Sequence, residues 1–139
     1  MVTNVANLLH NVPIFSDCSP KDLAAVARGL KEVNHKAGTV IAREGEPGVG
    51  LFVIVEGEAK VTIGDKPRRT LGPGEFFGEI ALLDGGPRTA TVTAETDLKL
   101  LGLTEWVFRG LVLEQPAIAV KTLQAMAGRL REATKVVTA

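Results

Sequence analysis

The sequence predicts an α+β protein in which helices precede and follow a central region of short strands. Apolar residues recur at helical spacing in residues 1–31 and again in residues 104–139. Between them, residues 32–103 contain short apolar segments with turn residues about every 8–12 positions, which is typical of a sandwich or barrel. The chain has 139 residues, of which 45% are hydrophobic, so it can bury a core of its own. We therefore expect a single domain over residues 1–139.

The N-terminal helical region divides into two predicted pieces. The first is a short apolar segment that turns at Pro13. Its apolar residues are Leu8, Leu9, Val12, Ile14 and Phe15. In the second piece Ser19 can cap a helix and Asp22 can complete a capping box. The helical spacing that follows predicts an end near Leu30 or Lys31.

Two patterns predict strands in the central region. The continuous apolar run at 51–55 indicates a central strand. Residues 58–63 and 89–94 alternate between apolar and polar, which is the two-residue period of a half-buried strand. A turn is expected at 64–67, and the leucines at 98–101 belong to the last strand.

Helical spacing returns in the C-terminal region. Thr104 can cap one helix, and Pro116 ends it. A final helix is predicted from 117 to about 136, with Trp106 and Met126 expected in the core. The apolar side of the final helix consists of Ile118, Leu123, Met126, Ala127 and Leu130.

Composition excludes several classes of function. The 16 basic and 16 acidic residues cancel, so no basic face for nucleic acid is predicted. No apolar run approaches the ~20 residues that span a bilayer, and no signal peptide is recognised at the N-terminus. Cys18 is the single cysteine, which agrees with a reducing cytoplasm, and we expect it to be a small buried side chain.

Residues 77–92 carry the motif that points to a function. Gly78 opens an apolar run that can form a short helix whose free N–H groups attract an anion. Glu79, in the first turn, can accept a hydrogen bond from a sugar hydroxyl. A Gly-Gly-Pro turn then returns the chain so that Arg88 faces the helix start, with the hydroxyl and N–H of Thr89 beside it. Each of these groups suits one part of a sugar phosphate.

This order of residues resembles the phosphate-binding cassette of cyclic nucleotide-binding domains. The family pattern is Phe-Gly-Glu-(Ile/Leu/Met)-Ala-Leu, a short spacer, and Pro-Arg-x-Ala-x-Val. Its ten positions are matched by Phe77, Gly78, Glu79, Ile80, Ala81, Leu82, Pro87, Arg88, Ala90 and Val92. The flanking segments 44–48, 55–58 and 71–76 also fit, so the resemblance covers about residues 8–133.

The family that the chain resembles includes catabolite activator proteins and regulatory subunits of protein kinase A. Within this family we expect a free-standing bacterial type. The resemblance implies an antiparallel, jelly-roll-like β-roll of about eight strands. A short phosphate-binding helix should be inserted in the roll, within a cassette at residues 77–90.

The resemblance also implies a set of ligand-binding residues. Arg88 and backbone N–H groups near Ala81 and Thr89 would hold the cyclic phosphate, and Glu79 would hold the ribose 2′-hydroxyl. The cassette residues in this set are Gly78, Glu79, Ile80, Ala81, Arg88 and Thr89. The base would lie against the apolar strand residues Val61 and Leu71. A lid from the final helix would come from among Leu130, Arg131, Ala133 and Thr134.

Three alternatives remain beside a cyclic nucleotide receiver. A metal-dependent enzyme of the cupin type would need clustered histidines, and the chain has only His10 and His35, so we expect no enzyme and no catalytic cofactor. A degenerate domain could serve only as an interaction module, with Glu79 and Arg88 reduced to a surface ion pair. The chain could also be the excised regulatory domain of a channel, cyclase or kinase, although Met1 and the C-terminal tail favour a free-standing protein.

Cyclic AMP is the favoured ligand, because it is the commoner messenger among related proteins. Cyclic GMP is the alternative, since a threonine at the position of Thr89 contacts the guanine amino group in parts of the family. Binding is expected to shift the C-terminal helices, which would signal to a downstream protein that the sequence does not identify. A homodimer through those helices is also considered.

Overall fold

Two four-stranded antiparallel sheets form the centre of the molecule in the computed structural model, which describes residues 5–48 and 50–135. One sheet has the strand order β1-β8-β3-β6 and the other has the order β2-β7-β4-β5. The strands are β1 (Lys31–His35), β2 (Val40–Ala42), β3 (Gly50–Glu56), β4 (Ala59–Ile63), β5 (Lys66–Leu71), β6 (Phe76–Phe77), β7 (Thr91–Ala94) and β8 (Leu98–Thr104). The predicted antiparallel β-roll of about eight strands is confirmed.

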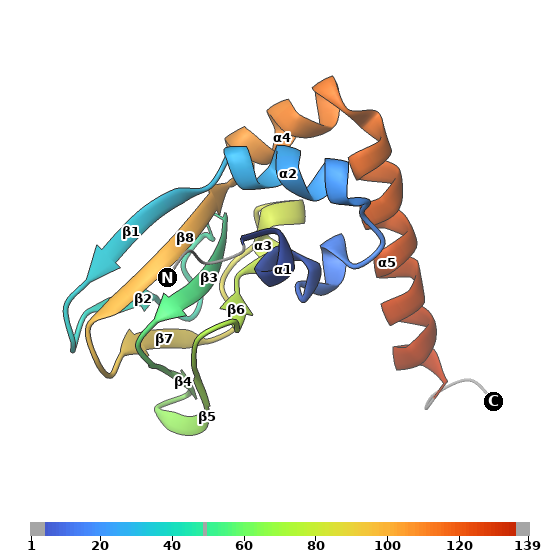
Figure 1. Cartoon of the computed structure of the whole chain (residues 1–139). Helices are drawn as coiled ribbons and strands as arrows, with labels where there is room; N and C mark the ends of the chain where they lie inside the picture. Colours follow the sequence, from blue (N-terminus) through green and yellow to red (C-terminus); the bar gives the residue numbers. More distant parts are fainter. Residues whose placement is uncertain (1–4, 49, 136–139) are drawn as a thin grey trace.

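The helices gather on one side of this roll (Figure 1). The short helix α3, which is part of the cassette, lies between the roll and the other helices, where it contacts β3 and α4. The helical segments are α1 (Val5–His10), the 3-10 turn η1 (Pro13–Phe15), α2 (Pro20–Arg28), α3 (Glu79–Asp84), α4 (Glu105–Glu114) and α5 (Pro116–Thr134). Within the described residues, no helix combines the length and the apolar character that crossing a membrane requires.

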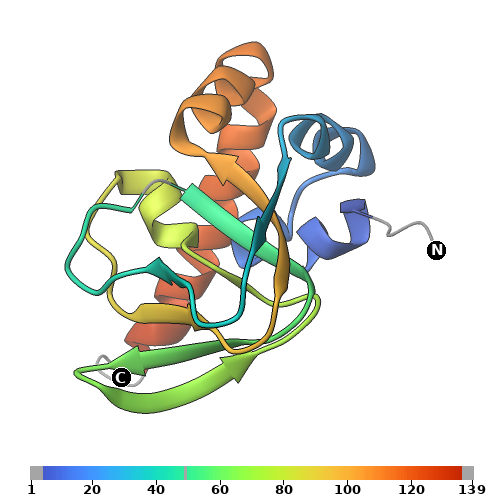
Figure 2. The same cartoon turned by 90° about the vertical axis from the view of Figure 1, so that its left-hand side faces the viewer.

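The strands follow the predicted patterns. The apolar run of β3 lies between β8 and β6, so its assignment as a central strand is confirmed. β4 and β5 pair as a hairpin in which Ile63 lies opposite Lys66, with the turn at Gly64 and Asp65. Asp65 adopts a φ of 65°, which aspartate tolerates in tight turns. Figure 2 shows this hairpin at the edge of the roll, where β5 has only one neighbouring strand.

Two apolar clusters hold these layers together. The first fills the space between the two sheets, with Ile54 and Leu100 from one sheet and Leu71 and Val92 from the other. The second lies between the outer face of β3 and β8 and the helices, and it includes Leu51, Leu103, Phe15, Phe108 and Ile118. The cassette helix contributes Leu82 to this second cluster, so its position depends on the helical layer.

The predicted helix caps at Ser19 and Thr104 are confirmed. The Ser19 hydroxyl accepts from the Asp22 N–H at 3.2 Å, and the Asp22 carboxylate accepts from the Ser19 N–H at 3.1 Å. The Thr104 hydroxyl accepts from the Val107 N–H at 3.2 Å. Such caps typically stabilise a helix by about 1 kcal/mol each.

Several element predictions need correction. α2 ends at Arg28 rather than near Leu30, because the chain must turn there into β1, and Gly29 packs against Val107 at a distance that a side chain would not allow. α5 begins at Pro116 itself, since proline fits the first turn of a helix. The helix is described as far as Thr134, and the predicted end near residue 136 lies outside the described residues.

Trp106 was predicted to be a core residue, and this is wrong. Its side chain is 80% exposed, while Phe108 from the same helix is buried. Residues two apart on a helix point in directions about 200° apart, so burying Phe108 turns Trp106 outward. The Arg109 guanidinium lies 6.0 Å from the Trp106 ring centroid instead.

The predicted apolar side of α5 is also only partly buried. Ile118 is fully buried and Met126 packs against the core from a half-buried position. Leu123 and Leu130 are 69% and 66% exposed, and Ala127 is exposed as well. The face that meets the protein is made by Ile118, Thr122 and Ala125.

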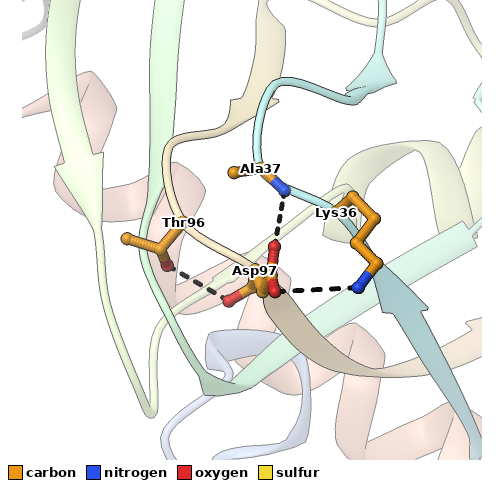
Figure 3. A network of polar contacts seen from close by, with 4 residues as sticks. All are labelled: Lys36, Ala37, Thr96 and Asp97. Atoms are coloured by element: carbon orange, nitrogen blue, oxygen red, sulfur yellow. Dashed lines mark hydrogen bonds and ion pairs between the residues drawn. The ribbon is translucent and has the colours of Figure 1, made fainter.

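A polar network joins the loop between β7 and β8 to neighbouring loops at one end of the roll (Figure 3). Asp97, between β7 and β8, accepts from the Ala37 N–H at 2.9 Å and pairs with the Lys36 amine at 4.0 Å. The Thr96 hydroxyl donates to the Asp97 carbonyl at 3.1 Å and accepts from the Glu58 N–H at 2.9 Å. These bonds hold the loop between β1 and β2 and the turn between β3 and β4 against the loop before β8, so we assign them a structural role.

Candidate ligand-binding site

Gly78 is the first residue that shapes the site. It precedes α3 with a φ of 88°, in the left-handed region that favours glycine. A Cβ at this position would collide with the Arg88 Nη1 and the Gly50 carbonyl oxygen. Glycine therefore lets the start of α3 approach the arginine closely. The first N–H groups of α3 have no carbonyl partner within the helix, and they lie beside this cation.

Arg88 is held in place by its backbone and its side chain. Its N–H donates to the Glu46 carbonyl at 2.7 Å, and its carbonyl accepts from the Gly45 N–H at 2.8 Å. Its Nη2 donates to the Gly50 carbonyl at 3.0 Å, while its Nη1 is buried without a hydrogen-bond partner. Burial lowers the pKa of Arg88 below its usual value. A desolvated guanidinium with an unsatisfied nitrogen provides a binding position for an anion.

Glu79, like Arg88, has a buried polar atom without a hydrogen-bond partner. Its side chain is 15% exposed, and its Oε1 lies 3.3 Å from the Arg129 Nη1 of α5. Its Oε2 is buried and has no partner. Because a buried carboxylate oxygen without a donor is costly, this atom is suited to accept from a ligand hydroxyl.

These residues line a single cavity of about 500 Å³. All eight predicted ligand-binding residues are in its lining: Gly78, Glu79, Ile80, Ala81, Arg88, Thr89, Val61 and Leu71. Val92, Ala42 and Phe77 extend the apolar wall, and Arg69 of β5 adds a second cation. The cavity thus has a polar end at α3 and the Arg88 loop and a mainly apolar wall along the sheet.

The four lid candidates lie elsewhere in this structure. Leu130, Arg131, Ala133 and Thr134 are exposed on α5, and the cavity lining does not include them. The contact between α5 and the cassette is made by Arg129 instead. Arg129 lies on the same face of α5 as the buried residues of this helix. The spacing shows this, because steps of four, three and four residues separate Ile118, Thr122, Ala125 and Arg129.

Arg69 was also missed in the sequence analysis. It lies two residues before Leu71 on β5 and directly opposite Val61 on β4. Side chains two apart on a strand, and cross-strand partners, share one face of a sheet. Placing Val61 and Leu71 in the site was therefore enough to place Arg69 there too.

Comparison with known proteins identifies the class. The family model for the cyclic nucleotide-binding domain matches residues 32–115, which is more than half of the chain. The chain therefore belongs to the cyclic nucleotide-binding domain family.

Individual relatives fall into several kinds of protein. The chain is 43% identical over 112 residues to the cyclic nucleotide-gated potassium channel mll3241 of Mesorhizobium japonicum, covering 81% of this chain and 31% of the channel. It is 30% identical over 129 residues to a CRP-like cAMP-activated global transcriptional regulator of Mycobacterium tuberculosis, covering 89% of this chain and 58% of that protein. The chain thus spans about a third to somewhat over half of the length of these curated relatives.

A solved structure supports the same family. The N-terminal domain of a transcriptional regulator from Streptomyces coelicolor A3(2) is 33% identical and superimposes with a TM-score of 0.85. The match covers 92% of this chain and 95% of that one. The names of these relatives describe transcriptional regulators and a channel.

Proposed function

We propose that this chain is a signal receiver that binds cyclic AMP and reports binding through its C-terminal helices. One observation carries the proposal. The Arg88 Nη1 and the Glu79 Oε2 are both buried without a partner, and both residues line the same cavity. A cyclic nucleotide offers an anionic phosphate for the first group and a ribose hydroxyl for the second, so one ligand would satisfy both.

The remaining contacts follow from the same orientation. With the phosphate at Arg88, the N–H groups at the start of α3 and the groups of Thr89 complete its binding position. The base then lies along the apolar wall at Val61 and Leu71. We propose cyclic AMP rather than cyclic GMP as the ligand, because the Mycobacterium tuberculosis relative is named as cAMP-activated.

Signalling through α5 is supported by the Glu79–Arg129 contact. Oε1 of Glu79 pairs with Arg129, which leaves Oε2 for the ribose, so one carboxylate connects the ligand to the final helix. A ligand can shift α5 only by its differential affinity for two helix positions. A change in how Glu79 holds Arg129 provides such a difference.

We further propose that residues 1–139 act as one binding domain, without catalytic activity or nucleic-acid contacts, in the cytoplasm. The balanced charge of the chain and the regulatory names of its relatives support this assignment. The downstream partner is a different protein, or it is a second copy of this chain that pairs through the exposed apolar residues of α5.

Titration calorimetry of the purified chain with cyclic AMP and with cyclic GMP tests the proposal. We expect saturable binding of cyclic AMP with one site per chain. 5′-AMP, which lacks the phosphate ring, is the control and should bind at least tenfold more weakly. Absence of binding by both cyclic nucleotides at millimolar concentration would refute the proposed function and favour a pure interaction module.

A further inference from the structure

A second cavity of about 370 Å³ lies between strands of both sheets and the first turn of α4. β1, β3 and β8 contribute residues from one sheet, and β2 contributes Ile41 from the other. None of the described residues lines both this cavity and the one at Arg88. A volume of this size is typical of a small-molecule site, so the chain has room for a second ligand.

The floor of this second cavity is a row of three cross-strand neighbours. Gly102 of β8 lies opposite Lys31 of β1 on one side and opposite Phe52 of β3 on the other. Cross-strand partners present their side chains on the same face of a sheet. A Cβ at Gly102 would lie only 3.1 Å from the Phe52 Cε1. The glycine therefore leaves space between a cation and an aromatic ring.

Aliphatic side chains complete the walls. Val33, Ile41 and Val107 line the cavity from β1, β2 and α4. Val33, Ile41 and Phe52 are only half-buried, although they pack against the core cluster between the two sheets. An apolar molecule bound in the cavity would remove this remaining surface from water, which favours binding.

The charge of the lining has one sign. Lys31 is the one described lining residue with a permanent charge, and within the described part of the chain no carboxylate pairs with it. Its acidic neighbour Glu32 is on the other face of β1, where it pairs with Lys99 at 3.2 Å. The only other ionisable side chain among the described lining residues is His35. The cavity thus combines apolar walls with a positive charge that has no protein counter-ion.

We propose that this second cavity is a binding site for a small monocarboxylate with an apolar body, of the kind that a medium-chain fatty acid provides. The carboxylate pairs with the Lys31 ammonium, and the hydrocarbon chain occupies the space over Gly102, against Phe52 and Val33. A neutral apolar ligand would leave the charge of Lys31 unused, and a strongly polar one would lose its hydration against the apolar walls.

This site is separate from the cyclic nucleotide site but next to it. The Phe52 ring stacks on the Phe77 ring with a centroid distance of 5.3 Å. Phe77 lines the cavity at Arg88, while Phe52 lines the second cavity. One ring of the pair therefore belongs to each cavity. The carboxylate site does not depend on the proposed function, because its residues do not include the phosphate-binding and ribose-binding groups.

The experiment titrates the purified chain with octanoate and follows the methyl groups by NMR. Octanamide has the same chain without the charge, so it is the matched control ligand. The signals of Val33, Ile41 and Val107 should shift with octanoate, while those of Val61 and Val92 in the other cavity should not.

Two variants test the role of the charge. Lys31→Met removes the ammonium group from a side chain that is exposed, so the fold should be retained. Lys99→Met is the matched control, because Lys99 lies on the neighbouring strand β8 and pairs on the opposite face of the sheet. Dissociation constants are measured for both ligands with the parent and each variant.

We expect the parent protein to bind octanoate about fivefold more tightly than octanamide, as an ion pair at a partly exposed site allows. Lys31→Met should lose this difference by weakening octanoate alone, and Lys99→Met should keep it. Equal affinities for the two ligands in the parent, or shifts confined to the cavity at Arg88, would overturn the inference. Absence of binding at about 10 mM octanoate would also overturn it, whatever the result with cyclic AMP.

Discussion

At the scale of single residues, Arg88 is the group on which affinity should depend most. It is buried, its backbone is fixed on both sides, and one of its guanidinium nitrogens has no partner in the described structure. An anion bound there is desolvated along with the guanidinium, so the charge-assisted hydrogen bonds are strong.

We predict that Arg88→Ala weakens cyclic AMP binding by about 3 kcal/mol or more, which is roughly a hundredfold. Arg88→Lys should recover only part of this loss, because an ammonium group cannot replace the planar fork. Calorimetry measures both effects, and circular dichroism confirms that the variants are folded. Affinity within threefold of the parent for folded Arg88→Ala would contradict the phosphate assignment.

The ribose assignment of Glu79 has its own test. If the free Oε2 accepts from the 2′-hydroxyl, 2′-deoxy cyclic AMP should bind the parent protein about tenfold more weakly than cyclic AMP. The Glu79→Ala protein should hardly distinguish the two ligands. This is a double-mutant cycle between protein and ligand, and equal penalties in both proteins would place Glu79 away from the ribose.

Cys18 shows how burial affects a residue outside the site. Burial, followed by the nearby charge of Asp22, raises the pKa of the Cys18 thiol from 9.0 to about 11. In the unfolded chain the thiol ionises near pH 9, while the folded protein keeps the proton up to about pH 11. The unfolded state therefore binds fewer protons in this window, and stability should fall as the pH rises from 9 towards 11.

The measurement is the free energy of unfolding by urea for the parent and for Cys18→Ala at pH 7, 9 and 10. Below pH 9 the difference between the two proteins should be constant. Above pH 9 the parent should lose stability relative to the variant. A difference that stays constant up to pH 10 would show that the thiol is not desolvated.

At the scale of elements, α5 connects the site to the surface. Its buried face packs on η1, and Lys121 pairs with the buried Asp22 of α2 at 3.8 Å. Further along, Arg129 is the contact with the cassette, and the residues after it are exposed. The part of α5 up to Met126 is therefore anchored in the helical layer, and the pair between Arg129 and Glu79 ties the part after it to the cassette.

We predict that cyclic AMP increases protection from amide hydrogen exchange in residues 78–90 and again in residues 126–135. The first segment contains the binding groups, and the second is the part of α5 that Arg129 holds. In Arg129→Met the increase should persist in the cassette and disappear from α5. Protection confined to the cassette in the parent protein would mean that α5 is not the lid and that the signal leaves by another element.

At the scale of the whole molecule, the outer face of the helical layer exposes several large apolar side chains. Val120, Leu123 and Leu130 are exposed on the side of α5 that points away from its buried face, and Trp106 and Leu113 are exposed on α4. Large exposed apolar residues that gather on neighbouring elements often mark an interface. Their spacing of three and seven residues on α5 suits packing against a second copy of the same helix.

We predict that the protein dimerises through this surface in sedimentation experiments at increasing concentration. Leu123→Glu should shift the equilibrium to the monomer, since it would place two charges in a desolvated contact. Ile63→Glu is the matched control, because Ile63 is also exposed but lies on β4. A parent protein that remains monomeric at all concentrations would contradict the prediction.

The sequence alone determined the local features and the chemistry of the cassette. The capping residues Ser19 and Thr104 act on N–H groups two or three positions away, so their roles are visible without the fold. The alternation in β4 and the apolar run of β3 reflect the two-residue period of strands. Glu79 and Arg88 were found because their order and spacing form a continuous motif.

The tertiary structure decided which face of each helix meets the protein and which distant side chains complete the site. Helical spacing groups Trp106 with Leu113 and Leu123 with Leu130, but it does not say whether such a group faces the core or the solvent. In the structure Phe108 and Ile118 face the core, and the groups on the other sides of α4 and α5 are exposed to solvent. Arg129 joined Glu79 for the same reason, since a contact between residues fifty positions apart depends on how α5 packs against the cassette.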